Sequence, residues 1–266
     1  MNPARPLHGR CALITGAEAG LGLAIADTLA RSGADIVMHC LQANESARQA
    51  QAALAREHGV RVLLLLQADL RDVDQIEAMA AQALAELPRL DILVNNAVVR
   101  HFEPAHELPR AHWDESLAVN LSAAFHLARL ALPGMLAQGW GRIINLSSVY
   151  GAGAAANRVG YVTTKTALLG LTRALAVETA ASGITSNAVA PGTAPTPAIV
   201  GRITEIARRD GVAQEQAERE YLAARQPTGR FVAMENVAAL VAFLCSDAGR
   251  DITGATLPID GGWTAA

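Results

Sequence analysis

The sequence predicts an α/β protein built on one doubly wound sheet of about seven parallel strands, with a small helical lid. Three observations support this prediction: short apolar runs alternate with longer alanine-rich amphipathic stretches, the apolar runs are continuous, and a glycine-rich turn follows the first of them. Continuous Val/Ile/Leu runs are typical of parallel strands buried on both faces. Because repeated strand–helix units wind into such a sheet, we expect ligands to bind along its carboxyl edge.

Seven strands are expected in chain order, at 11–15, 36–40, 60–66, 92–94, 142–146, 185–189 and 256–259. Helical patterns lie between them, near 21–32, 44–58, 72–86, 111–132, 159–181 and 235–246. The segment 193–230 interrupts this alternation with two polar helical stretches, near 197–209 and 213–225. Either a lid over substrate or a packing or subunit-contact element would account for this insertion. No linker or repeat divides the chain, so one domain over 1–266 is predicted.

The overall composition describes a globular protein with a large core and excludes several classes of function. The chain has 266 residues, 51% of them hydrophobic, and a net charge of -3, which gives no support for nucleic-acid binding. Cys11, Cys40 and Cys245 are far apart, so neither a disulfide framework nor a zinc cage is expected, and a cytoplasmic setting is favoured. Residues 1–10 lack a signal-peptide core, and the aliphatic run 62–66 is too short to cross a membrane.

A glycine-rich turn separates the first expected strand from the first expected helix. Its glycines are Gly16, Gly20 and Gly22. Glycine permits a tight turn and a close approach of the backbone to a ligand. The helix that follows offers free N–H groups and a positive dipole end, which suit a pyrophosphate. A glycine triplet alone is a weak signal, but its position between strand and helix predicts a dinucleotide site.

Tyr161 and Lys165 are four residues apart at the start of an expected helix, so their side chains share one face. Ser148 follows the fifth expected strand, with Ser147 as its neighbouring alternative, and Asn120 lies in the preceding helix. A tyrosine hydroxyl with its ordinary pKa of about 10 is a poor base near neutrality. A nearby ammonium group lowers that pKa, and a drop of two to three units corresponds to roughly 3–4 kcal/mol. The pair therefore predicts proton transfer at a substrate oxygen.

These segments together resemble the short-chain dehydrogenase/reductase family. The turn 15–22 matches T-G-x-x-x-G-x-G, and the four residues just described match an Asn–Ser–Tyr–Lys tetrad. Residues 91–97 match D-x-L-V-N-N-A, although Val98 replaces the glycine that follows, and 191–196 match P-G-x-x-x-T. The resemblance covers about residues 7–263. It implies a Rossmann-type fold and an enzyme that uses NAD or NADP to interconvert a secondary alcohol and a ketone.

The resemblance also implies roles for individual residues. Lys165 would hold the cofactor ribose, Ser148 would hydrogen-bond the substrate oxygen, and Asn120 would hold a water that relays protons from Lys165. The implied cofactor-binding residues are Thr15, Gly16, Gly20, Leu21, Gly22, Leu41, Asp69, Leu70, Asn96, Ala97, Val119, Tyr161, Lys165, Pro191, Gly192, Ala194 and Thr196.

The choice between the two cofactors depends on residues near the first and second strands. Family members that use NADP usually carry a cation at the position of Ala19 or just after the second strand, where this chain has Cys40 and Leu41. Glu18 would disfavour an extra phosphate if it faced the adenosine end. NAD is therefore favoured over NADP, although position 40 commonly holds an Asp that binds the ribose. His39 is either a weak phosphate partner or a packed strand residue.

Within the family, segments 139–145, 226–232 and 260–265 resemble those of bacterial D-3-hydroxybutyrate dehydrogenases. The substrate pocket implied by that likeness keeps Trp263 and changes four other residues. Arg100 stands in place of Gln, Tyr150 of His, Arg158 of Lys and Thr193 of Trp. Guanidinium groups bind carboxylates through paired hydrogen bonds, so the arginines predict an anionic hydroxy acid. The alternative is that these arginines face solvent or pair with Glu103, Glu205 or Glu218. The expected substrate-binding residues are Arg100, Ser148, Tyr150, Arg158, Tyr161, Thr193, Arg202 and Trp263.

Other interpretations remain open at this stage. A 3-oxoacyl-thioester reductase using NADPH and a polyol or sugar dehydrogenase are the alternative enzymes, and a catalytically silent nucleotide-binding protein is the alternative outside enzymes. The resemblance implies a homotetramer formed through the helices near 111–132 and 159–181 and the last strand. No G-x-S-x-G motif indicates a serine hydrolase.

A metal site is not predicted, although His101, Glu103, His106, Glu107 and His112 are close in sequence. His106 and His112 are six residues apart, whereas two histidines on one helical face need a spacing of four. A proline at position 109 also interrupts any helix between them.

Overall fold

The computed structural model describes residues 5–59, 62–87 and 89–266. Its strands form one sheet in the order β3-β2-β1-β4-β5-β6-β7, and every pairing is parallel. The strand order reverses between β1 and β4, which is where ligands bind in doubly wound sheets. The predicted fold is therefore confirmed; residues 60–61 of the third predicted strand lie outside the described residues. The strands are β1 (Cys11–Ile14), β2 (Asp35–Cys40), β3 (Val62–Gln67), β4 (Ile92–Asn95), β5 (Gly141–Leu146), β6 (Ile184–Pro191) and β7 (Thr256–Ile259).

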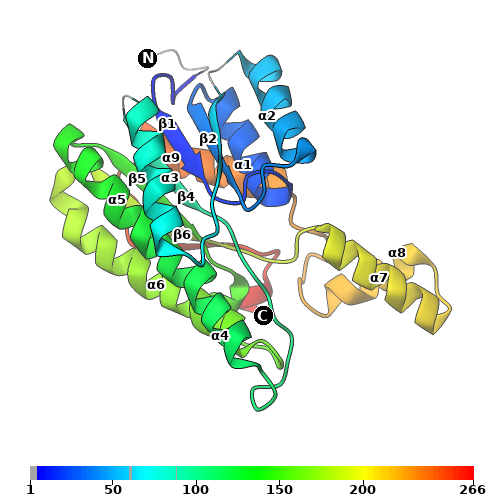
Figure 1. The fold of residues 1–266 in the computed structure, drawn as a ribbon. Helices are drawn as coiled ribbons and strands as arrows, with labels where there is room; N and C mark the ends of the chain where they lie inside the picture. The colour runs from blue at the N-terminus through cyan, green and yellow to red at the C-terminus, as the bar shows by residue number, and fades with distance from the viewer. Residues whose placement is uncertain (1–4, 60–61, 88) are drawn as a thin grey trace.

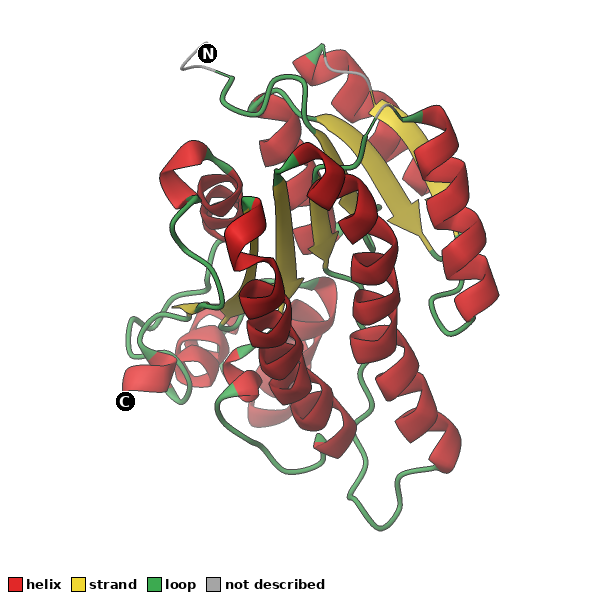
Figure 2. Cartoon of the chain, turned by 90° about the vertical axis from the view of Figure 1, so that its left-hand side faces the viewer, coloured by secondary structure: helices red, strands yellow, loops and turns green. Residues whose placement is uncertain are grey.

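Helices cover both faces of the sheet (Figures 1 and 2). One apolar cluster joins the strands to α1 (Gly20–Arg31), α2 (Glu45–His58) and α9 (Met234–Cys245). A second cluster joins the opposite face to α3 (Val73–Glu86), α5 (Ala123–Gln138) and α6 (Val159–Thr179). Burial on both faces explains why the strands read as continuous apolar runs. None of the described helices is long and apolar enough to cross a membrane.

The single helix predicted near 111–132 is wrong in detail. The structure has α4 (Arg110–Leu117), a π-helical turn (Ala118–Ser122) and then α5, which continues through Pro133 to Gln138. A π-helical turn places an extra residue in the hydrogen-bond ladder and often occurs at functional sites. The helix ends at Gly139, whose left-handed φ of 63° is a conformation that glycine adopts without strain.

The insertion between β6 and β7 forms two helices, α7 (Pro197–Asp210) and α8 (Gln214–Ala223), close to the predicted bounds. Figure 1 shows them side by side, projecting from the body of the molecule beyond the sheet. They have a small apolar core of their own, made of Ile203, Ala207 and Ala217. The two helices therefore pack mainly against each other.

Candidate active site

A cavity of about 490 Å³ lies at the carboxyl ends of the strands. It runs from the ends of β2 and β3, where Leu41 and Asp69 line it, to the ends of β5 and β6, where Ser148 and Thr196 line it. All of the predicted cofactor residues line this cavity except Thr15 and Gly20. The cavity is therefore lined by residues at the carboxyl ends of six strands, β1 to β6, which parallel pairing brings to one edge of the sheet.

The phosphate loop between β1 and α1 is fixed by hydrogen bonds to the end of β4. Thr15 Oγ1 accepts from the backbone N–H groups of Asn96 and Ala97, at 2.9 and 3.0 Å. The Asn96 amide donates to the carbonyl oxygens of Thr15 and Gly16. Thr15 is buried and outside the cavity, so its hydroxyl holds the loop in place instead of facing a ligand.

The glycines leave a cradle that no other residue could provide. Gly16 and Gly20 have φ of 61° and 56°, in the left-handed region. A Cβ on Gly22 would lie 2.0 Å from the Gly16 carbonyl oxygen and 2.6 Å from Asn96 Nδ2. The N-terminus of α1 begins at this loop, so its N–H groups face the cavity without a side chain in between. These residues fit the pyrophosphate of a dinucleotide.

His39 at the end of β2 is a packed residue that also supports the phosphate loop. Its Nδ1 accepts from the Gly16 N–H and its Nε2 donates to the Ala68 carbonyl, both at 3.1 Å. Burial lowers the pKa of His39, which keeps the ring neutral and able to accept from Gly16. The sequence had left its role open, and the strand pattern alone held no sign of this contact.

The predicted catalytic pair, Tyr161 and Lys165, lies on the first turns of α6. Lys165 is buried and its Nζ donates to the Leu146 carbonyl at the end of β5, 2.5 Å away. Tyr161 and Ser148 line the cavity beside it. Ser147, the alternative serine, donates its hydroxyl proton to the Lys165 carbonyl at 2.9 Å and so anchors the helix. The geometry thus selects Ser148 as the serine whose hydroxyl is available to a substrate.

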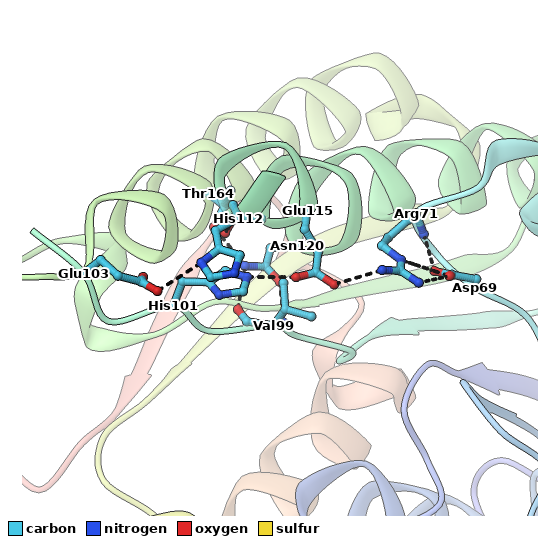
Figure 3. Close-up of polar contacts among 10 residues, drawn as sticks. Asp69, Arg71, Val99, His101, Glu103, His112, Glu115, Asn120 and Thr164 are labelled. Atoms are coloured by element: carbon cyan, nitrogen blue, oxygen red, sulfur yellow. Dashed lines mark hydrogen bonds and ion pairs between the residues drawn. The ribbon is translucent and has the colours of Figure 1, made fainter. Parts of the chain in front are cut away.

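Asn120 lies in the π-helical turn, and its side chain ties the catalytic helices to the loop after β4 (Figure 3). Its Oδ1 accepts from the Val99 N–H at 2.8 Å, and its Nδ2 donates to the Val99 carbonyl at 3.0 Å and to Thr164 Oγ1 at 3.3 Å. A second cavity of about 10 Å³ lies between Asn120 and Lys165. This volume corresponds to about one water, the size that the expected relay requires.

The electrostatics of the site favour ionisation of Tyr161. Burial opposes ionisation most strongly, but the charges of Lys165 and Arg100, with hydrogen bonds from Ser148 and Arg100, lower the pKa of Tyr161 overall. Burial lowers the pKa of Lys165 to about 8, against the opposing influence of Tyr161. The result is a tyrosine hydroxyl that can exchange a proton nearer to neutrality than an exposed one.

Comparisons with known proteins agree with this geometry. A family model described as Enoyl-(Acyl carrier protein) reductase matches residues 16–264. The chain is 41% identical to the D-beta-hydroxybutyrate dehydrogenase of Cupriavidus necator, over 97% of this chain and 99% of that protein. The chain belongs to the short-chain dehydrogenase/reductase family.

Two further relatives show the range of proteins that this dehydrogenase resembles. It is 40% identical to the cis-4-hydroxycyclohexanecarboxylate dehydrogenase of Sinomonas cyclohexanicum, over 96% of this chain and 97% of that protein. The L-sorbose reductase of Gluconobacter frateurii, solved with NADPH and L-sorbose, superposes with a TM-score of 0.93 at 30% identity, with 99% of each chain covered. The protein is thus an NAD(P)-dependent alcohol dehydrogenase or ketone reductase, as predicted.

On the substrate side of this dehydrogenase, aromatic rings and two arginines surround Tyr161. The Arg100 guanidinium lies 5.4 Å from the Tyr161 ring centroid and lines the cavity. The Tyr150 ring packs edge-on against Tyr161 at 6.2 Å and against Trp263 at 5.6 Å. The Arg158 guanidinium lies 5.2 Å from the Tyr150 ring centroid. Arg100 and Tyr150 therefore lie against Tyr161, whereas Arg158 and Trp263 lie against Tyr150.

Two other expected substrate residues have different positions. Thr193 is buried, and its backbone N–H donates to the Gln226 side chain while its carbonyl accepts from the Val232 N–H. Arg202 is exposed on α7 and does not line the cavity, whereas Ile199 on the same helix does. Helical periodicity places residues 199 and 202 near one face, but the inclination of α7 brings only its first turn to the cavity.

A chain of polar contacts that the sequence did not predict runs from the segment after β3, through α4, to the loop after β4. Arg71 bridges Asp69 and Glu115, and Glu115 accepts from His101 at 2.8 Å (Figure 3). The His101 ring stacks on His112, with ring centroids 3.9 Å apart and planes at 11°.

His112 in turn contacts Glu103 at 3.0 Å. Three of the five residues considered as metal ligands therefore do come together, with ligand atoms within 4.8 Å of one another. The rings of His101 and His112 are nearly parallel, so the nitrogens of the two rings lie side by side instead of pointing at a common centre. The arrangement links the adenosine end of the cavity to the segment that holds Arg100.

Proposed function

We propose that this dehydrogenase interconverts a small hydroxy acid and the corresponding keto acid, with Arg100 and Arg158 holding the substrate carboxylate. The supporting observation is that neither guanidinium has a carboxylate partner in the part of the chain that the structure describes. Arg158 lies between the rings of Phe102 and Tyr150, 4.7 and 5.2 Å from their centroids. Because guanidinium groups bind carboxylates through paired hydrogen bonds, an anionic substrate would supply the missing partner.

In this proposal, the protein side chains around the substrate oxygen carry out the proton transfer, and the cofactor carries out the hydride transfer. A bound nicotinamide ring would accept or supply the hydride at the carbinol carbon. The Tyr161 phenolate takes the hydroxyl proton when the alcohol is oxidised and returns it when the ketone is reduced. Ser148 Oγ donates to the same oxygen, and the Lys165 ammonium favours the ionised tyrosine. The small cavity between Lys165 and Asn120 provides a position for a water that exchanges protons with the ammonium.

The relatives support an acidic substrate of this class. Both the hydroxybutyrate and the hydroxycyclohexanecarboxylate dehydrogenases act, by their names, on compounds with a carboxylate and a hydroxyl group. We propose a 3-hydroxy acid such as 3-hydroxybutyrate, or a larger hydroxy acid, as the substrate of this chain.

The test is the specificity constant of Arg158→Ala, measured for 3-hydroxybutyrate, for cis-4-hydroxycyclohexanecarboxylate and for the methyl ester of each. We expect kcat/KM for the acids to fall at least about tenfold, since an ionic hydrogen bond contributes roughly 1.5–3 kcal/mol. The esters carry no charge, so their kcat/KM should change little.

Arg202→Ala is the matched control, because it removes the same charge from the exposed face of α7. The control should leave kcat/KM unchanged for every compound. Equal losses on acid and ester in Arg158→Ala would show that the arginine supports the fold of the pocket and does not bind a carboxylate. Higher activity on neutral polyols than on any acid would favour the sugar-dehydrogenase alternative.

We also propose that the protein acts as a cytoplasmic homotetramer. Phe125 and Leu136 on α5 and Val177 on α6 are exposed apolar side chains, and Val177 has 79% of its surface accessible. Large apolar side chains gathered on neighbouring helices are typical of subunit interfaces. Cys40 and Cys245 are free thiols, which agrees with a reducing compartment. Light scattering of the intact protein measures the assembly, and a monomer at micromolar concentration would contradict this proposal.

A further inference from the structure

One carboxylate oxygen at the cavity has no partner. Glu18, in the phosphate loop between β1 and α1, lines the cavity. Its Oε2 is buried from solvent and, among the described residues, no group donates a hydrogen bond to it. A buried anionic oxygen without a donor is costly, so such an atom calls for an explanation. If the carboxylate turned toward the cavity, the hydroxyl groups of a ligand could donate to this oxygen and remove the cost.

The charge of Glu18 lies beside the end of β2. Burial and then the charge of Glu18 raise the pKa of the Cys40 thiol, which places the carboxylate near that residue. The cavity runs past this point along Leu41 and Asp69, at the opposite end from Tyr161. In dinucleotide-binding folds, this end receives the adenosine ribose.

At the end of β2, the side chains of His39, Cys40 and Leu41 offer no free acceptor for ribose hydroxyls. In dinucleotide folds an acidic residue about 20 positions beyond the glycines commonly binds the 2′-hydroxyl. Here the corresponding stretch holds His39, whose two ring nitrogens are both engaged, and Cys40, which is buried with its thiol directed at the Leu66 carbonyl. Leu41, which follows, is apolar and half exposed.

We propose that Glu18 selects NAD over NADP by accepting hydrogen bonds from the adenosine ribose diol. In this proposal, the carboxylate that binds the ribose is on the phosphate loop and not at the end of β2. The glutamate side chain is long enough to reach the ribose hydroxyls from there. A carboxylate binds a neutral diol through its hydroxyl protons, and it repels a 2′-phosphate at the same place. Arg48, an exposed cation on α2, acts on the same Cys40 thiol and lowers its pKa, opposite to the effect of Glu18.

The test measures binding of ADP-ribose and of 2′-phospho-ADP-ribose, which differ only in the 2′-phosphate, by isothermal titration calorimetry. The intact protein should bind ADP-ribose at least about tenfold more tightly, because two like charges at close range cost more than 1.4 kcal/mol even when partly screened. Glu18→Gln keeps the size of the side chain and removes its charge. We expect this variant to reduce the preference at least about tenfold.

Glu86→Gln is the matched control, since Glu86 is exposed at the end of α3, away from the carboxyl edge of the sheet. It makes the same change in net charge and should leave the preference unchanged. Glu18→Ser is a second variant with a side chain too short to reach the diol, and thermal unfolding checks that each variant is folded.

Two results would overturn the proposal. One is an unchanged preference in both Glu18 variants. The other is tighter binding of the 2′-phosphate by the intact protein, which would assign the ribose site to Arg48 as a phosphate ligand. Neither measurement uses a hydroxy acid, so failure here is distinct from failure of the proposed substrate.

Discussion

The floor and the rim of the cavity are built in different ways. The floor comprises the phosphate loop 15–22 and the tetrad, and its polar side chains are tied to backbone groups of neighbouring strands, as Asn120 is to Val99 and Lys165 to Leu146. The rim comprises 98–109, Arg158 and the pair α7–α8. Arg100 and Arg158 there rest on aromatic rings, and Phe102 is 52% exposed. The difference indicates that the reaction depends on fixed geometry, whereas substrate choice depends on side chains with room to adapt.

Gly22→Ala tests whether the floor is as intolerant as its geometry indicates. The added Cβ would overlap the Gly16 carbonyl, so the phosphate loop must move away from the end of β4. We expect NADH binding to weaken at least about a hundredfold, since displacing a binding group by about 1 Å commonly has an effect of this size. Fluorescence titration with NADH gives the dissociation constant.

Gly170→Ala is the control for this prediction. Gly170 lies in α6, and a Cβ there would meet nothing within 4 Å. An alanine should be tolerated or should stabilise the helix. If Gly22→Ala bound NADH as the parent protein does, the floor would be adaptable after all, and the contrast with the rim would disappear.

A smaller effect, on the pH dependence of kcat, is expected for Arg100, which lies where the rim meets the floor. In the proposed mechanism the Tyr161 phenolate takes the proton of the alcohol, so we expect kcat for oxidation to rise with pH through the pKa of that residue in the enzyme–substrate complex. Arg100 lowers the pKa of Tyr161. Removing this cation in Arg100→Gln therefore raises the pKa, and the rising limb of the kcat–pH profile should move to higher pH.

The conservative variant separates charge from substrate binding. Arg100→Lys keeps a cation and should restore the midpoint of the profile toward that of the parent protein, even where KM stays raised. A midpoint that is the same in Arg100→Gln and in the parent would mean that Arg100 acts only on the substrate. In that case the rim would not influence the proton chemistry of the floor.

Local sequence patterns predicted most of the floor. Strand and helix bounds follow from apolar periodicity, and the glycines of the phosphate loop follow from their place between a strand and a helix. The spacing of Tyr161 and Lys165 predicts a shared helical face, because that relation depends only on the pitch of one helix. The position of Arg202 did not follow from its spacing, because it depends on how α7 is inclined to the sheet.

The amino-acid sequence alone determined the sheet, the nucleotide loop and the Tyr161–Lys165 pair, since each depends on residues that are near one another in the chain. Only the tertiary structure decided that the Ser147 hydroxyl is engaged by the Lys165 carbonyl, that His39 supports the phosphate loop, and that Glu18 carries a carboxylate oxygen without a partner among the described residues. The first two properties are set by contacts between segments that are 18 and 23 residues apart in the chain. Burial and hydrogen-bond partners across such distances are products of packing, and no local pattern in the chain records them.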